Sequence, residues 1–158
     1  MGRTKDTLMR TAVDVHNFLV EREVPHELVP TQGRLRPPER VAAVLGLEPG
    51  QVGRVRLFQG QGLVAALVQA DREPSPDLLR AAAGEVAEVD DARATDLTQF
   101  LAEATPPVGL PEGTTTILDE VLAGQEVLYF PGGEATSLLK IRPDDIIAAT
   151  GARVAPLT

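Results

Sequence analysis

The sequence predicts a single domain of the α+β class, with helices packed around a curved, mostly antiparallel, barrel-like sheet. Its 158 residues, 43% of them apolar, suit one domain with a substantial core. Short β-prone runs alternate along the chain with segments whose apolar residues recur at helical spacing. The turn Gly60-Gln61-Gly62 separates two of these runs and predicts an antiparallel hairpin. We therefore expect one domain over residues 1–158, in which residues 1–5 need not be ordered.

Five helices are expected from apolar periodicity, bounded by capping residues, prolines and glycines. The first covers residues 6–22, with Thr4 or Asp6 as its N-cap. Its apolar face is expected to carry Met9, Ala12, Val13, His16, Leu19 and Val20. The remaining helices are expected at residues 37–45, 76–83, 91–102 and 143–150. Three of these four stop at a glycine, which suits the left-handed conformation of a C-terminal cap.

Eight strands are expected from short runs of aliphatic and β-branched residues between turn formers. They cover residues 26–29, 53–58, 63–69, 86–89, 114–118, 127–130, 137–141 and 152–157. Residues 63–69 are almost wholly apolar, so this strand should be central and covered on both faces. The loop at residues 30–36 is rich in turn formers and is expected to lie over a pocket.

Charge and composition exclude several classes of function. The net charge of −8 argues against broad, non-specific nucleic-acid binding, although it permits binding to one end of an RNA. Arginines nevertheless gather within residues 34–56, as either an ordinary solvated surface or a phosphate-facing patch. They are Arg34, Arg36, Arg40, Arg54 and Arg56. No apolar run is long enough to span a membrane and no signal peptide is evident, so a cytoplasmic protein is expected.

Common catalytic motifs are missing from the sequence. It contains no P-loop, no G-x-G-x-x-G and no G-x-S-x-G pattern. Without cysteine, its two histidines cannot form a typical structural zinc site. No metal or organic cofactor is implied. The function must therefore be sought in less familiar patterns.

Four segments in order carry a resemblance to a known family. The longest, at residues 126–157, contains the turn Pro131-Gly132-Gly133 followed by SLLKIRPDDI and TGARVAPL. The others read VHNFLVEREVPHELV at 15–29, AAVLGLEPGQVGRVRLF at 42–58 and PPVGLPEG at 106–113. Together they resemble the YbaK family of free-standing aminoacyl-tRNA deacylases, which are related to the editing domain inserted in prolyl-tRNA synthetases. The likeness runs from about Val13 to Leu157.

The resemblance implies a fold and a function. It implies that the chain hydrolyses, in trans, the ester of a mischarged tRNA, most naturally one of the tRNA(Pro) type. The implied partner is the 3′ end of an aminoacyl-tRNA, with a tRNA synthetase as a further candidate and with neither DNA nor a membrane. Such editing is needed because a synthetic site rejects small or isosteric amino acids poorly.

The resemblance also points to four catalytic candidates: Arg54, Pro107, Gly109 and Gly133. Backbone N–H groups of residues 107–109 and of the glycine turn would stabilise a developing oxyanion. Arg54 stands where the family typically has a lysine, and it would hold a phosphate or carbonyl but could not carry a proton. The rival interpretation is therefore a non-catalytic module that binds a tRNA end, a nucleotide or a protein. A purely structural interaction domain is a third possibility.

Further residues are expected to contact the substrate. They are His26, Thr31, Thr105, Val108, Asp119, Gly132 and Ser137. Three of these positions keep structural alternatives. His26 could be an ordinary surface histidine, Asp119 a solvated acid at a strand end, and residues 105–111 a rigid crossing loop. The family usually has a glycine upstream of that loop, whereas this chain has Glu103-Ala104-Thr105.

Overall fold

Two sheets make up the framework of the protein. The structure, a computed structural model, describes residues 9–31 and 40–158. The smaller sheet is antiparallel, in the order β1-β7-β6, and the larger is mixed, in the order β4-β2-β3-β5-β8. The strands of the two sheets are β1 (Glu27–Pro30), β2 (Gly53–Gln59), β3 (Leu63–Gln69), β4 (Ala87–Glu88), β5 (Thr115–Asp119), β6 (Leu128–Pro131), β7 (Ser137–Ile141) and β8 (Arg153–Ala155). The two sheets adjoin at a parallel bridge between Val52 and Tyr129.

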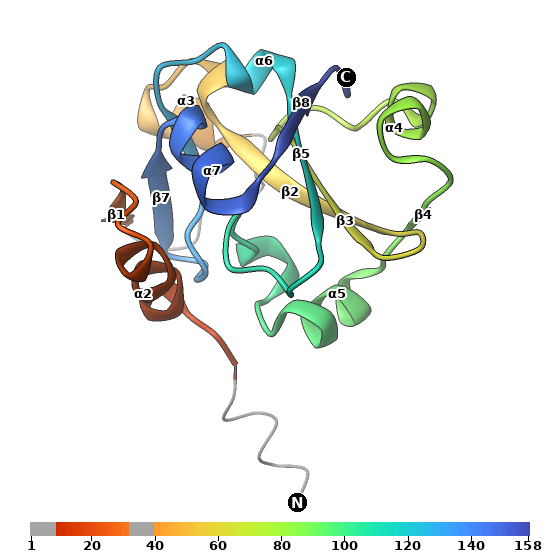
Figure 1. Cartoon of the computed structure of the whole chain (residues 1–158). Coiled ribbons are helices and arrows are strands. Elements are labelled where there is room, and N and C mark those ends of the chain that lie inside the picture. The colour runs from red at the N-terminus through yellow and green to blue at the C-terminus, as the bar shows by residue number, and fades with distance from the viewer. Residues whose placement is uncertain (1–8, 32–39) are drawn as a thin grey trace, which may run out of the picture.

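Helices close the ends and edges of these sheets. They are α2 (Ala12–Glu21), α3 (Val41–Leu45), α4 (Pro76–Ala83), α5 (Asp91–Thr98), α6 (Glu120–Ala123) and α7 (Pro143–Thr150), with 3₁₀ turns η2 (Pro49–Gln51) and η3 (Ala102–Ala104). Figure 1 shows α2 beside the small sheet, α5 below the large one and α4 beyond its far edge. In the described part of the chain, no helix is long and apolar enough to cross a membrane.

The predicted fold class is confirmed. Within the described ranges, four strand pairings are antiparallel and two, β3 with β5 and β5 with β8, are parallel. The chain between β3 and β5 contains α4 and α5, so β5 can return alongside β3 in the same direction. The apolar run of β3 lies in the middle of the large sheet with six of its seven residues buried, as its composition predicts.

The core lies between the sheets, and its packing leaves no space for a side chain at Gly53. Phe100, Phe130 and Leu139 are fully buried in its main cluster, together with Val15 from α2. A side chain at Gly53 would overlap the ring of Phe130. Gly53 therefore allows β2 to approach β6 closely, one residue before the arginine that the sequence singles out.

The first helix differs from its prediction in start and orientation. It begins at Ala12, where Thr11 accepts a hydrogen bond from the Val13 amide and donates its own amide to Asp14 in a capping box. The proposed caps Thr4 and Asp6 lie outside the described residues. The predicted apolar face is right at Leu19, which is buried, but it omits Val15, which is fully buried as well. By contrast, Val13, His16 and Val20 are exposed.

Other differences concern the ends of elements. The helix predicted at 91–102 stops at Thr98, because Gln99 takes a left-handed conformation with φ of 67°. This reversal turns Phe100 into the core. The four-residue helix α6 was not predicted, and the start of the helix predicted at 37–45 lies outside the described residues. So does most of the loop at 30–36.

Candidate functional site

A cavity of about 280 Å³ lies beside β2 and the turn that follows β6. Strand β2 lines it with Arg54 and Arg56, the η3 segment with Glu103 and Thr105, and the stretch before and within β7 with Glu134 and Ser137. Its volume is near the lower end of the roughly 300–1,000 Å³ of small-molecule sites. The cavity can therefore hold a small polar group, or the end of a larger molecule.

Strand geometry places the two arginines together. Arg54 and Arg56 are two residues apart on β2, so their side chains leave the same face of the strand. Their partners on β3 are Val68 and Ala66, which cannot neutralise them. The side chains are only about one-fifth exposed, at 21% and 22%. The resemblance gave a catalytic role to Arg54 and left Arg56 only in the possible phosphate-facing patch, although the alternation of side chains along a strand could have paired the two.

Two carboxylates neutralise this arginine pair. Glu73, from the loop between β3 and α4, forms ion pairs with both Arg54 and Arg56, and Glu88 of β4 forms a second pair with Arg56. Partial burial raises the pKa of Glu73, but hydrogen bonds and charge from Arg56 and Arg54 outweigh it, so the pKa lies below its ordinary value of 4.5. No sequence motif pointed to Glu73.

The described lining of the cavity is more acidic than basic. Besides the two arginines it contains four carboxylates, those of Glu88, Asp91, Glu103 and Glu134. One of them is also structural, because Glu134 Oε2 accepts a 2.9 Å hydrogen bond from the amide of Ala12 at the start of α2. The excess of negative charge favours a ligand that carries a positive group.

Two predicted substrate contacts, Thr105 and Ser137, line the cavity beside Arg54. The Thr105 hydroxyl lies 3.0 Å from the Ala102 carbonyl and 3.2 Å from the Leu101 carbonyl, and donates toward them. Its oxygen lone pairs can therefore still accept a hydrogen bond from a ligand. Arg54, Thr105 and Ser137 are the predicted site residues that the structure brings together.

The backbone amides of Gly132 and Gly133 in the glycine turn already donate hydrogen bonds within the protein. The N–H of Gly132 donates to the Ser137 carbonyl over 2.9 Å, and that of Gly133 donates to the Ala104 carbonyl over 3.0 Å. Both glycines are buried and neither lines the cavity. The expected oxyanion role of this turn is therefore not available in this geometry. The turn instead ties β7 to the η3 segment.

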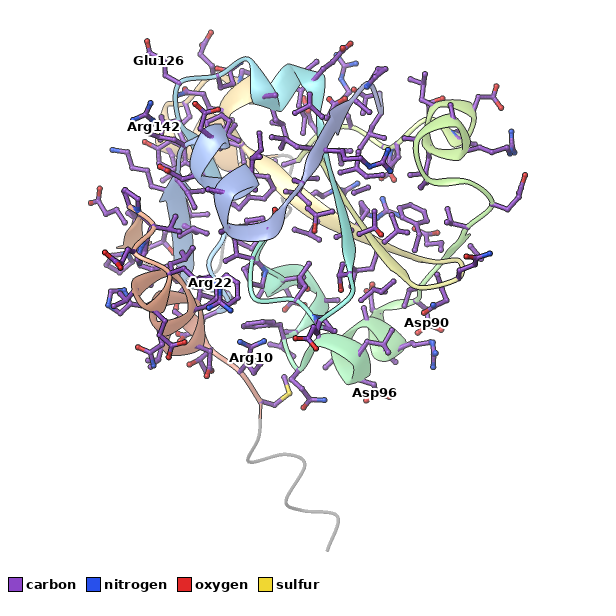
Figure 2. The ribbon with its side chains drawn as sticks, viewed as in Figure 1. Arg10, Arg22, Asp90, Asp96, Glu126 and Arg142 are labelled. Atoms are coloured by element: carbon purple, nitrogen blue, oxygen red, sulfur yellow. The ribbon has the colours of Figure 1, made fainter. Side chains whose placement is uncertain are left out.

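The loop at residues 105–111 is also held by contacts outside the cavity. Pro107, Val108 and Gly109 are buried and do not line the cavity, and a proline has no N–H to offer. The Gly109 carbonyl accepts a hydrogen bond from Arg10, whose guanidinium also lies 4.9 Å from the centre of the Phe100 ring. Figure 2 shows Arg10 where the segment before α2 meets the region of α5. Residues 107–109 are therefore placed as in a rigid crossing loop, which was the alternative to a substrate-binding loop.

Asp119 is a structural residue at the end of β5. It is fully buried, its Oδ1 accepts a 2.8 Å hydrogen bond from the Leu157 amide, and its Oδ2 accepts one of 3.1 Å from the Thr158 hydroxyl. It does not line the cavity, and it is not the solvated acid of the alternative either. Its contacts hold the C-terminal segment against the large sheet.

His26 and Thr31 also lie away from the cavity lining. His26 borders a second, shallower depression of about 780 Å³, where Figure 2 shows Arg142 and Glu126 on one side of the molecule. Its Nε2 lies 3.0 Å from Nδ1 of His16, and its Nδ1 lies 2.9 Å from the Val24 carbonyl. The Thr31 amide donates to the Thr136 carbonyl, next to Ser137.

Comparisons with known proteins agree with this fold. A solved structure of a candidate trans-editing enzyme for prolyl-tRNA synthetase has a TM-score of 0.82 and 27% identity, covering 93% of this chain and 96% of its own. A structure from work on grafting linear epitopes onto scaffold proteins has a TM-score of 0.82 and 28% identity, with the same coverage. A hypothetical protein with 24% identity and a TM-score of 0.85 shares the fold, over 91% of this chain and 98% of its own.

Sequence comparison gives the family. Among curated proteins, no significant match to this chain was found. The family model described as "Aminoacyl-tRNA editing domain" matches residues 32–149, well over half of the chain. Its span includes the arginine pair of β2, Thr105 and Ser137. The chain therefore belongs to the YbaK-like family of aminoacyl-tRNA editing domains.

Proposed function

We propose that this protein edits aminoacyl-tRNA in trans, by hydrolysing the ester between a wrongly attached amino acid and the 3′ end of a tRNA. The substrate we favour is of the tRNA(Pro) type, with a tRNA synthetase as a working partner. The observation that carries the proposal is the near full-length likeness to a candidate trans-editing enzyme for prolyl-tRNA synthetase. The small polar cavity beside Arg54 would receive the aminoacyl end.

The lining residues suit the two charges of this substrate. The α-ammonium of the amino acid would lie toward Glu103 and Glu134, in the acidic part of the cavity. Arg54 would hold a phosphate or the ester carbonyl, for which its planar guanidinium offers paired donors. Ser137 would hydrogen-bond the substrate. This arrangement positions the ester without any covalent intermediate.

The chemical step requires an attacking oxygen and a stabilised oxyanion. A water would attack the ester carbonyl, because attack by a hydroxyl of the tRNA would move the amino acid to another ribose oxygen and would not release it. The bond to the ribose oxygen would break, and that oxygen would take a proton. Because the amides of Gly132 and Gly133 are committed, we assign stabilisation of the oxyanion to a guanidinium donor of Arg54 that does not hold the phosphate, rather than to the glycine turn.

A deacylation assay tests the proposal directly. The panel contains tRNA(Pro) charged with alanine, cysteine or proline, and it measures amino-acid release against the spontaneous rate. Faster release of one amino acid supports editing and names its substrate. Release at the spontaneous rate for every member, with the protein folded, contradicts it.

The rival function is a binding module without hydrolysis. The observation that favours it is the ion pairing of Arg54 with Glu73, which neutralises the cation that replaces the family's usual lysine. Arg54→Lys separates the two functions. If Arg54 works in catalysis, release should fall about tenfold or more, because a lysine cannot reproduce the planar donor pair. A gain of hydrolysis would instead indicate a decayed editing site and favour the binding module.

A further inference from the structure

Two arginines of the cavity share a single carboxylate. Glu73 Oε2 pairs with Nη2 of Arg54, and Glu73 Oε1 pairs with Nη1 of Arg56. Each arginine therefore receives one oxygen of Glu73 rather than the two-point contact that a guanidinium prefers from a carboxylate. The carboxylate is planar, so its two oxygens cannot serve both guanidinium edges fully at once.

This sharing leaves one buried donor of Arg54 without an acceptor. Over the described residues, the Nε–H of Arg54 is buried and has no hydrogen-bond partner. It belongs to the same guanidinium edge as the Nη2 that reaches Glu73. A buried donor that lacks a partner is unfavourable. Arg54 can therefore donate one more hydrogen bond, from its Nε–H, to an oxygen of a ligand.

We propose that the Arg54–Arg56 pair is a binding site for a phosphate group, and that Glu73 is an internal anion that occupies this site until the phosphate displaces it. A tetrahedral phosphate presents oxygens in more than one plane. One oxygen can accept from Nε–H of Arg54 while the others face Nη2 of Arg54 and Nη1 of Arg56. The assignment deepens the proposed function, since the phosphate would be one near the tRNA terminus.

Glu73 is well placed to leave. Its side chain is 67% exposed and lies on the loop between β3 and α4, outside the cavity lining. Because the Glu73 carboxylate is already largely hydrated, it can move into water at little cost as long as the incoming phosphate neutralises the mostly buried arginines. Arg56 would keep its second partner, Glu88, and would stay in position. The exchange therefore needs no change in the sheets.

Phosphate binding to Glu73→Gln tests the exchange. Titration calorimetry at low salt would use two probes, inorganic phosphate and a short single-stranded RNA whose phosphates are all internal. We expect Glu73→Gln to bind at least one probe about three- to tenfold more tightly than the unchanged protein. Tighter binding of the RNA alone identifies a phosphodiester ligand, and tighter binding of the ion alone identifies a free phosphate.

Glu85→Gln is the matched control. It removes an exposed carboxylate that pairs with Arg80 on α4, so it makes the same change in net charge away from the arginine pair. Equal gains in Glu73→Gln and Glu85→Gln would mean a general charge effect and would overturn the proposal. So would a gain that persists when Arg54→Gln is added to Glu73→Gln. Because no tRNA is hydrolysed in this experiment, its result is independent of whether the protein edits.

Discussion

Gly133→Ala would measure how firmly the glycine turn is held against the first helix. A Cβ at Gly133 would lie 2.9 Å from Cγ2 of Val15 and 3.0 Å from the backbone of Thr11. The residue also has a φ of 98°, which an alanine adopts poorly. The conformational penalty is about 1–2 kcal/mol and the overpacking penalty about 1–3 kcal/mol. We expect the free energy of unfolding to fall by about 2–5 kcal/mol.

Gly113→Ala supplies the control for this measurement. Gly113 has a similar φ of 89°, but a Cβ there would meet nothing within 4 Å. Urea unfolding of the two variants therefore separates the packing penalty from the backbone penalty, as long as the slope with denaturant stays unchanged. Equal losses in both variants would refute the reasoning, since they would mean that α2 yields freely to the added methyl group.

The result also bears on how activity data should be interpreted. Gly133→Val would be a natural probe of the oxyanion role that the resemblance implies for the glycine turn. In the structure, any side chain at Gly133 pushes on α2, whose first amide is bound by the cavity residue Glu134. Loss of deacylation in that variant could therefore result from a displaced α2 and Glu134 as well as from a lost oxyanion contact.

Three further predictions concern stability. Gly53→Ala should lower the free energy of unfolding by about 1–3 kcal/mol or more in urea, because its methyl group would overlap the buried ring of Phe130; an unchanged midpoint would contradict the close approach of β2 and β6. Asp119→Ala should cost about 1–3 kcal/mol, because it leaves the buried Leu157 amide without its acceptor, and amide exchange there should speed up. The pKa of Glu73 is lowered in the folded protein, so its contribution to stability is fully present above its ordinary pKa of 4.5 and is lost as pH falls through the folded pKa. The difference in unfolding free energy between the unchanged protein and Glu73→Gln should therefore shrink on acidification below about pH 4.5, and a difference that grows there would refute the ion pairing.

Local rules explain why much of the fold was predictable. The apolar run at β3 had to be buried on both faces, and the period of two along β2 put Arg54 and Arg56 on one side. Proline at the start and glycine at the end gave the bounds of α4 and α7. These features depend on neighbours in sequence, which can be read without knowing the tertiary contacts.

The sequence by itself determined the family, the class of the fold and the segment that carries the arginines. Tertiary structure decided which stripe of α2 faces the core, because stripes through Val13 and through Val15 both include Leu19 at helical spacing, and only packing favours the stripe with Val15. It also decided that the amides of Gly132 and Gly133 are used by distant carbonyls, and that Glu73 reaches Arg54 from 19 residues away. Hydrogen-bond partners of this kind are set by where the chain returns in space, and no local pattern records them.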